Sequence, residues 1–440
     1  MFTNRKVFKE PFYYQYMDIR SIIKEQRQEL EDINKQERLI TREGLDKAKK
    51  YLSHPNVLVI TGIRRSGKSI FSYLLERDKK FGYINFDDER LFNFKAEDLN
   101  KVLSAFYELY GDENLEYLIF DEIQNISGWE LFINRLRRTK KVIVTGSNSN
   151  LLSSEISTHL TGRHIDVHLF PFSFKEFLNF KNFKIQKTYT TKEKSRILNY
   201  LREYSKEGGF PEVYKFGKIM ASRIYEDILT KDIILRYQIK KIDEIKKMAK
   251  YLISNSTEEI SYSKIAKLFG IKHVSTISNW INYLEDSFLI FRLERFSFKL
   301  KQQHVAPKKI YCIDTGMVDS IGFKFSENKG KIIENLVALE LQRQKSKNQN
   351  LEIYYWKNIQ QKEVDFVLKE NKTIKELIQV SYIESKEEIK KREIDALLKA
   401  SKELRCKNLK IITWNYESEQ KSKGNKIEFI PLWKWFLKIK

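Results

Sequence analysis

The chain has 440 residues, of which 41% are hydrophobic and 13% aromatic, and it carries a formal net charge of +22. This length is too great for one compact core, so we expect roughly two to four folded domains. No apolar run approaches the ~18 residues that span a bilayer, and no secretory signal is visible, so a membrane role is excluded. Cys312 and Cys406 lie far apart without metal spacing. They exclude a disulfide scaffold and a cysteine zinc site, and they predict a cytoplasmic protein.

The positive charge is spread along the chain and forms no single basic tail. A lysine-rich and isoleucine-rich composition also arises from an AT-rich genome. The charge by itself therefore leaves two interpretations open, attraction to nucleic acid and compositional bias.

In chain order, residues 1–45 are predicted to form an N-terminal helical segment, because apolar residues recur at helical spacing from Ile19 to Ile33. Four short apolar runs then predict buried strands: VLVIT at 57–61, YINF at 83–86, YLIFD at 117–121 and VIVTG at 142–146. Helical stretches separate these runs, the first at residues 70–76. The alternation predicts a parallel sheet in an α/β ATPase core over residues 46–173.

The segment GIRRSGKS at residues 62–69 matches the P-loop pattern at every fixed position and lies between an apolar strand and a helix. Its glycines let backbone N–H groups face phosphate oxygens, Lys68 supplies charge to the β- and γ-phosphates, and the Ser69 hydroxyl is a Mg²⁺ ligand. A chance glycine turn is the alternative. The predicted ATP-binding residues are Gly62, Ile63, Arg64, Arg65, Ser66, Gly67, Lys68, Ser69 and Ile70.

Two carboxylates, Asp121 and Glu122, end the third predicted strand. Ligands bind at the carboxyl ends of the strands in such sheets. We therefore expect Asp121 to hold Mg²⁺, mainly through water, and Glu122 to polarise the water that attacks the γ-phosphate. The alternative is a pair of helix-capping acids.

Two further polar positions are candidates for the catalytic step. Asn148 or Ser147, at the end of the fourth strand, would orient water against the γ-phosphate, and an ordinary turn is the alternative. Arg163, which follows a glycine, would stabilise transition-state charge in cis or from a neighbouring subunit. An exposed surface arginine is the alternative for Arg163.

The ordered set GIRRSGKS, LIFDEIQ, VTGSNS, LTGR, PFSFKEF and GGFPEV resembles a family of archaeal and bacterial AAA-type ATPases. In that family a P-loop domain precedes a winged helix and a C-terminal domain of unknown function with a restriction-endonuclease-like fold. The resemblance supports Arg163 as a γ-phosphate-sensing residue. It also implies that the stretch from Gly208 to Val213 closes a helical lid near the nucleotide, with a helix-ending turn as the alternative.

Residues 174–250 are helical and highly charged and form the predicted lid, and residues 251–300 form the predicted winged helix. A tight turn at Gly270 separates two helices there, and Ile277, Ile281 and Leu284 make the apolar face of the second. Contact with double-stranded DNA through the exposed face is one expectation, and a protein contact is the other. The residues of that face are Lys272, His273, Ser275, Thr276, Ser278 and Asn279.

Residues 301–440 resemble the metal-dependent restriction-endonuclease-like core. Glu334, Asp365 and Gln379 match its acidic helix residue and its two strand positions, but Ser381 stands where that core has lysine. A serine cannot steady the attacking hydroxide. We therefore expect a degenerate domain without nuclease activity, with Lys362 or Lys386 as the cations that could replace the missing lysine.

These features together predict an α/β protein with a P-loop parallel-sheet domain, a helical lid, a winged helix and a mixed α/β C-terminal domain. Its expected function is Mg²⁺-dependent ATP hydrolysis that drives domain movement, with DNA as a candidate partner. The alternative is an ATP-gated scaffold or switch that binds a protein partner without nucleic-acid activity. A homo-oligomer is compatible with either function.

Overall fold

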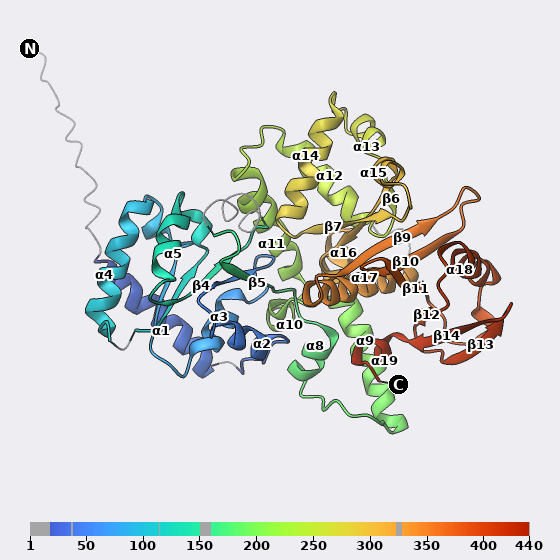
Figure 1. Cartoon of the computed structure of the whole chain (residues 1–440), viewed down its shortest axis with the longest axis horizontal. Helices are drawn as coiled ribbons and strands as arrows, with labels where there is room; N and C mark the ends of the chain where they lie inside the picture. The colour runs from blue at the N-terminus through green and yellow to red at the C-terminus, as the bar shows by residue number, and fades with distance from the viewer. Residues whose placement is uncertain (1–17, 37, 114, 150–159, 323–327, 440) are drawn as a thin grey trace, which may run out of the picture.

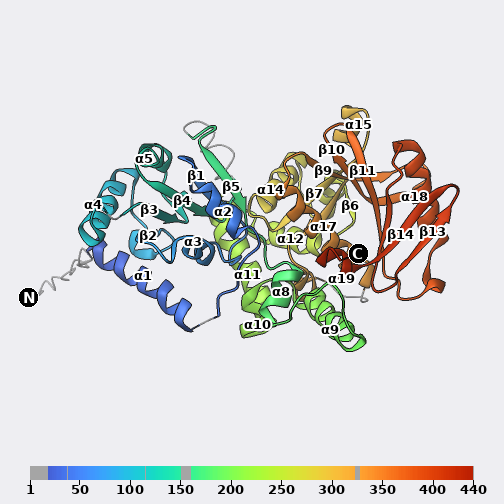
Figure 2. The same ribbon diagram turned by 60° about the horizontal axis from the view of Figure 1, so that its bottom comes forward.

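A computed structural model describes residues 18–36, 38–113, 115–149, 160–322 and 328–439 of the chain. Figures 1 and 2 both place an N-terminal α/β unit at one end of the molecule, a C-terminal sheet at the other, and a group of helices between them. Among the described residues, no helix combines the length and the apolar character that crossing a membrane requires.

The N-terminal unit is a five-stranded parallel sheet in the order β2-β3-β4-β1-β5. Its strands are β1 (Val57–Thr61), β2 (Phe81–Asn85), β3 (Tyr117–Asp121), β4 (Lys141–Gly146) and β5 (His164–His168). Its helices are α1 (Ile19–Gln36), α2 (Leu45–Tyr51), α3 (Lys68–Glu76), α4 (Leu99–Tyr110) and α5 (Trp129–Leu136).

The four predicted strands are confirmed as β1 to β4. They read as continuous apolar runs because successive side chains enter two different cores: Val57 and Val59 lie in one cluster, and Leu58 and Ile60 in the other. The sequence analysis missed β5. This strand lies at the sheet edge, and its residues HIDVH are polar and only partly buried, so they carry no buried-strand signal.

The helices between the two sheets are α8 (Phe174–Phe180), α9 (Thr191–Glu207), α10 (Pro211–Phe216), α11 (Ile219–Asp227) and α12 (Ile242–Ser254), with a π-helix at Ile228–Leu235. Capping boxes begin two of them, Ser173 with Glu176 at α8 and Thr190 with Glu193 at α9. These local signals explain where α8 and α9 begin within the predicted helical segment.

The C-terminal half is built on a nine-stranded sheet in the order β13-β14-β12-β11-β10-β9-β7-β8-β6. Its strands are β6 (Glu259–Ile260), β7 (Ile290–Arg295), β8 (Lys308–Cys312), β9 (Leu351–Lys357), β10 (Glu363–Glu370), β11 (Thr373–Ser381), β12 (Leu409–Thr413), β13 (Ser418–Ser422) and β14 (Asn425–Pro431). Its helices are α13 (Tyr262–Leu268), α14 (Val274–Asp286), α15 (Leu300–Val305), α16 (Thr315–Ile321), α17 (Lys329–Lys347), α18 (Lys391–Leu404) and α19 (Leu432–Leu437).

Strands β6 to β8 and helices α13 and α14 are continuous with the rest of the C-terminal half. The antiparallel β7–β8 ladder crosses the predicted boundary between residues 300 and 301, and β7 also pairs with β9. Ile277, Ile281 and Leu284 of α14 are fully buried, as their spacing predicts. Ser261 precedes α13, but its hydroxyl lies 3.0 Å from that of Ser263 and does not cap the helix.

A buried carboxylate joins the helices to the C-terminal half. The Gly209 N–H donates to Asp314 Oδ2 at 2.6 Å, and Asp314 caps α16 by accepting from Met317 N at 3.2 Å. A Cβ at Gly208 would lie 2.1 Å from Asp314 Oδ1, so only glycine fits against this carboxylate. Burial raises the pKa of Asp314 to about 7, although these N–H donors oppose the shift.

This raised pKa predicts a specific pH dependence of stability. Asp314 holds its proton more tightly in the folded chain than in the unfolded chain, where its pKa is about 3.9. Its contribution is therefore fully present below about pH 4 and is lost as the pH rises through about 7. Between pH 5 and 8, the melting temperature of the parent should fall relative to that of Asp314→Asn. Parallel curves for the two proteins, with Asp319→Asn on the same helix as the control, would contradict this assignment.

Candidate functional site

The loop between β1 and α3 has the backbone of a phosphate-binding cradle. Gly62, Arg65 and Gly67 have φ angles of 153°, 62° and 91°, so residues with positive φ recur along the loop. Residues with positive φ set between residues with negative φ turn N–H groups toward one side and form an anion-binding nest. A Cβ at Gly62 would lie 2.1 Å from the Leu169 carbonyl oxygen, which explains why this position requires glycine.

Lys68 and Glu122 face each other across this loop. The Lys68 Nζ lies 3.2 Å from Glu122 Oε1 and donates to the Ile63 carbonyl at 3.3 Å. Glu122 also accepts from the Ser147 N–H at 3.1 Å. Burial favours the neutral acid, but the adjacent Lys68 ammonium lowers the pKa of Glu122 to about 2. Glu122 is therefore ionised at neutral pH, as a residue that polarises water must be.

Asp121 ends β3 as a fully buried side chain. It accepts hydrogen bonds from the Tyr83 hydroxyl at 2.7 Å and from the Thr145 hydroxyl. Burial raises the pKa of Asp121, and the charge of Glu122 raises it further, while hydrogen bonds, including one from Ser69, oppose the shift. Asp121 and Ser69, the two predicted Mg²⁺ ligands, are thus close enough to act on one cation.

The predicted sensor segment contacts the C-terminal half of the molecule. The Asn148 side chain is buried and lies 3.5 Å from the Tyr237 hydroxyl, which donates to Asp286 at 3.2 Å. Ser149 bonds to Asp286 at the end of α14 twice, with its N–H to the carbonyl and with its hydroxyl to the carboxylate, both at 2.8 Å. The tip of β4 is therefore hydrogen-bonded to the end of α14.

The residues around the P-loop and the carboxyl end of β3 fit a nucleotide with its cation. Ser66 is fully buried, and its hydroxyl has no hydrogen-bond partner among the described residues, which leaves an orphaned polar atom inside the cradle. No group of three or more His, Cys, Asp and Glu side chains in the described ranges is arranged to hold a metal ion. A site of this type does not require such a group, because one carboxylate, one hydroxyl and the phosphates surround the cation.

Two P-loop arginines are held by acids from the helices, and the sequence analysis did not anticipate these contacts. Arg64 makes a bidentate ion pair with Asp232 of the π-helix, and both N–O distances are 3.0 Å. Arg65 donates to Glu212 at 2.8 Å and lies 3.5 Å from Asp227. Acidic residues are frequent in these helices, so no sequence signal distinguishes the ones that reach the loop.

The predicted lid stretch, Gly208 to Val213, therefore has two different environments. Glu212 reaches the P-loop through Arg65, whereas Gly208 and Gly209 pack against Asp314 and the backbone of Phe172. The expectation that this stretch lies near the nucleotide applies to its acidic residue and not to its glycines.

A buried ion pair behind the P-loop is a second feature that the sequence did not reveal. Arg42 Nε donates to Glu176 at 2.9 Å, and the two side chains are 7% and 6% exposed. The guanidinium also donates to the Ser66 carbonyl at 2.7 Å and to the Phe170 carbonyl at 2.6 Å. Arg42 thus fixes the P-loop to the segment that begins α8.

Arg163 lies at the opposite end of the parallel strands from the P-loop. It precedes β5, its carbonyl accepts from the N–H of Val57 at the start of β1, and its side chain is exposed. The length of β1, on the order of 15 Å for five residues, separates it from the loop. The alternative in cis is therefore wrong on geometric grounds. A role across a subunit boundary stays a prediction.

In the C-terminal half, a lysine from another strand supplies the ammonium that Ser381 cannot. Lys309 of β8 lies 2.9 Å from Glu334, 2.5 Å from Glu363 and 3.4 Å from Asp365. The expectation that Lys362 or Lys386 would take this place is therefore replaced by Lys309. Periodicity could not reveal this contact, because β8 lies far from the other residues in the sequence.

The residues around Lys309 do not fit a divalent cation. Asp365 Oδ2 already accepts from Gln379 Nε2 at 2.6 Å and from the Val380 N–H at 2.8 Å. Glu334 accepts from Tyr311 at 2.9 Å as well as from Lys309. The Lys309 ammonium occupies the space between the carboxylates, and their attraction raises its pKa well above the usual range against the effect of burial.

Three family models match successive parts of the chain. An AAA domain matches residues 54–178, a domain of unknown function (DUF8612) matches residues 198–327, and a second domain of unknown function (DUF4143) matches residues 329–435. The end of the first match lies in α8, and the third begins at α17.

Similar proteins occur in archaea and bacteria. The uncharacterized protein MJ1544 of Methanocaldococcus jannaschii is 42% identical over 407 residues, covering 87% of this chain and 89% of the relative. An uncharacterized protein of Haemophilus influenzae is 31% identical over 307 residues, covering 65% of this chain and 74% of that protein. The solved structure of the Aeropyrum pernix Orc1 protein in complex with DNA is 11% identical with a TM-score of 0.30, covering 68% of this chain and 93% of that one.

The Lys309 cluster yields a stability prediction. Lys309→Met removes the ammonium at nearly constant volume and leaves three carboxylates facing one another. At pH 7 the loss in unfolding free energy should be about 3–5 kcal/mol, as for other broken buried ion pairs. The loss should shrink at pH 5, because burial raises the pKa of Asp365, so protonation relieves the repulsion.

Denaturant unfolding of both variants at the two pH values checks this prediction. Lys369→Met is the matched control, since Lys369 pairs at a more exposed site with Glu352 alone and should contribute under about 1 kcal/mol. Equal losses for the two variants would show that the Lys309 cluster is solvated.

Proposed function

Because the chain belongs to a family of AAA-type P-loop ATPases that carry a DUF4143 domain, we propose that it hydrolyses ATP and transmits its nucleotide state to the C-terminal half. The contact between Lys68 and Glu122 is the observation that carries the proposal. In this proposal Lys68 is the cation that binds the phosphates, and Glu122 is the ionised carboxylate that acts on water.

Each residue of the site has a defined role in this proposal. Bound Mg²⁺ would neutralise phosphate charge, and Ser69 and Asp121 are the residues that would hold it. Lys68 binds the β- and γ-phosphates. Its ion pair with Glu122 must loosen when phosphate oxygens compete for the ammonium, and this leaves Glu122 to orient the attacking water. The nearby Asn148 amide would hold that water or the γ-phosphate.

The same competition applies to the two P-loop arginines. Phosphate oxygens that approach the nest would attract Arg64 away from Asp232 and Arg65 away from Glu212. These acids belong to the π-helix and α10, so nucleotide binding would shift the helices that join the two halves. The Asn148–Tyr237–Asp286 contacts give a second connection, which ends at α14. We therefore assign the lid role to these helices.

Replacing Glu122 tests the hydrolytic role. Glu122→Gln keeps the shape of the side chain and removes its charge, so ATP binding should persist while turnover falls by about 10²–10⁴-fold. Steady-state phosphate release and equilibrium ATP titration measure the two quantities. Lys68→Ala is the matched control and should lose tight binding. Turnover of Glu122→Gln within threefold of the parent would move the catalytic role to another residue.

Duplex DNA is the partner that the α14 surface favours. The helix pair α13–α14 followed by β7 and β8 has the order of a winged helix, and Lys272, His273, Ser275 and Asn279 are exposed on it. Such a face suits phosphate contacts that carry little sequence information. Because Asp286 ends the same helix, DNA on this face would influence the ATPase site through Ser149.

The ATPase rate with and without duplex DNA, at several salt concentrations, tests this coupling. DNA should change the rate, and the effect should weaken steeply with salt, with a log–log slope of about −0.9 per phosphate neutralised. Lys272→Glu should weaken binding to unrelated duplexes by similar factors. Asp286→Asn should retain DNA binding but lose the rate response. An ATPase rate that is the same with and without DNA at low salt would favour the alternative function, a switch that binds a protein partner through this face.

A further inference from the structure

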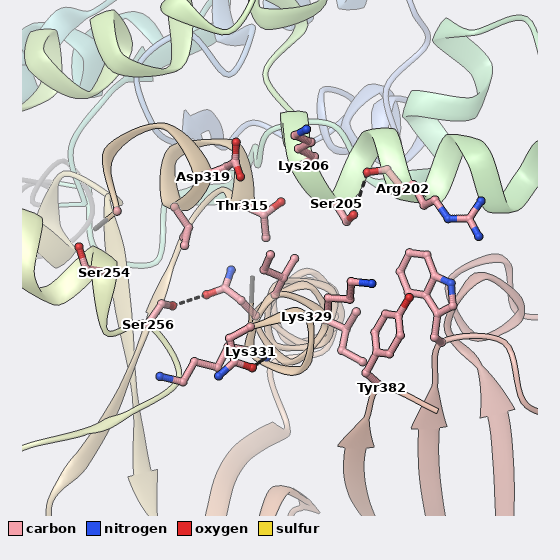
Figure 3. Close-up of a pocket in the computed structure, with 17 residues that line it drawn as sticks. Arg202, Ser205, Lys206, Ser254, Ser256, Thr315, Asp319, Lys329, Lys331 and Tyr382 are labelled. Carbon is pink, nitrogen blue, oxygen red and sulfur yellow. Dashed lines mark hydrogen bonds between the residues drawn. The ribbon is translucent and has the colours of Figure 1, made fainter. Parts of the chain in front are cut away.

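A cavity separate from the P-loop lies where the helices meet the C-terminal half (Figure 3). Its volume is about 360 Å³, within the range of small-molecule sites. It is bounded by α9 on one side, by α16 on another, and by the first turn of α17 with the ends of β11 and β12 on the remaining side. An occupant would therefore contact α9, the α16–α17 region and the ends of β11 and β12 together.

The interior of this cavity contains polar atoms that the protein leaves unsatisfied. The Thr315 side chain is 2% exposed, and its hydroxyl has no hydrogen-bond partner among the described residues. Trp414, 3% exposed, likewise has an indole N–H without a partner there. In Figure 3 the Thr315 hydroxyl points toward Lys206 and Ser205 on α9. An unsatisfied buried hydroxyl costs stability, so its retention indicates a ligand that completes its hydrogen bonding.

The rest of the polar interior is already satisfied. Ser256 donates to Asn335 Oδ1 at 2.6 Å, and Asn335 donates to the Cys312 carbonyl at 2.9 Å. These bonds fix one side of the cavity in the absence of a ligand. The unsatisfied groups of the lining are thus the Thr315 hydroxyl and the indole N–H of Trp414.

The charge around the cavity favours an anion. Arg202 and Lys206 project from α9 and Lys329 from the first turn of α17, whereas Lys331 of the same turn is paired with Glu258. Asp319 is the one acidic side chain among the described lining residues, and it is paired with Lys218 at 2.9 Å. The N-terminus of the 19-residue α17 adds partial positive charge from its backbone N–H groups.

The opposite part of the lining is aromatic and apolar. The rings of Tyr382 and Trp414 are stacked, with centroids 5.3 Å apart at an angle of 22°. Lys329 Nζ lies 5.1 Å from the Tyr382 ring, so this wall and the cationic group are adjacent. Ile332 and Val318 complete the apolar lining. A ligand with a charged group at one end and a flat apolar body would satisfy both parts.

We propose that this cavity is a binding site for a small organic phosphate with an aromatic body. Arg202 and Lys206 of α9 and Lys329 at the start of α17 hold its phosphate. The Thr315 hydroxyl donates a hydrogen bond to the same phosphate. Its ring packs against the wall formed by Tyr382 and Trp414. The bound molecule bridges α9 to the C-terminal sheet, at a place distinct from the ATP site.

Pyridoxal 5′-phosphate is a suitable probe, because it joins a phosphate to an aromatic ring and reports its position covalently. Its aldehyde condenses with a lysine amine to an imine with loss of water, and borohydride reduces the imine to a stable amine. The experiment uses the full chain with Lys68→Ala, which removes the P-loop lysine from the labelling. Mass spectrometry then gives the labelling rate at each lysine.

Lys206 or Lys329 should be labelled about tenfold faster than Lys194, an exposed lysine on α9 outside the cavity, which corresponds to ~1.4 kcal/mol of preferential binding. Pyridoxal, which lacks the phosphate, should show no preference, and inorganic phosphate should slow the labelling by the phosphorylated probe. Arg202→Gln and Thr315→Val should each lower the preference without lowering the melting temperature, and Thr315→Val should raise it because the unsatisfied hydroxyl is removed. Equal rates at Lys194 and at the cavity lysines, or equal rates with the two probes, would overturn the proposal.

Discussion

The carbonyl groups of residues 170–172 are the constraint on which the arrangement of the molecule depends. These residues follow the edge strand β5 of the N-terminal sheet. Carbonyl groups that are removed from water there need hydrogen-bond donors from the protein. Arg42 donates to the carbonyl of Phe170, and Arg343 of α17 lies 3.2 Å from those of Pro171 and Phe172. The Tyr204 hydroxyl also donates to Phe172 O, at 2.7 Å. One turn therefore connects the P-loop, α9 and the C-terminal half.

This connection explains how a small change at the nucleotide site could reach distant elements. Arg42 holds the P-loop from behind, while Asp232 and Glu212 hold it from the front through its arginines. The loop is thus enclosed by ion pairs from both sides. Charged partners in a partly buried environment respond strongly to a new charge, so a triphosphate would redistribute these pairs instead of adding to them.

The C-terminal half shows a different use of buried charge. Where a restriction-endonuclease-like core would hold a metal ion, the ammonium of Lys309 neutralises Glu334, Glu363 and Asp365. An internal cation is permanent and needs no water-filled coordination sphere. The ion pairs of Lys309 can therefore connect β8 with β10 and α17 without a reactive water.

The sequence by itself determined the parallel sheet, the P-loop and the acidic end of β3, because these depend on local spacing: apolar runs, fixed glycines and adjacent carboxylates. It also indicated the apolar face of α14, since helical periodicity is local. The tertiary structure alone decided which acids hold Arg64 and Arg65, that Lys309 replaces the lysine absent at Ser381, and that Arg163 lies away from the P-loop in its own chain. These outcomes depend on strand order and on contacts between residues separated by 25 to 168 positions, and no local pattern encodes such pairings.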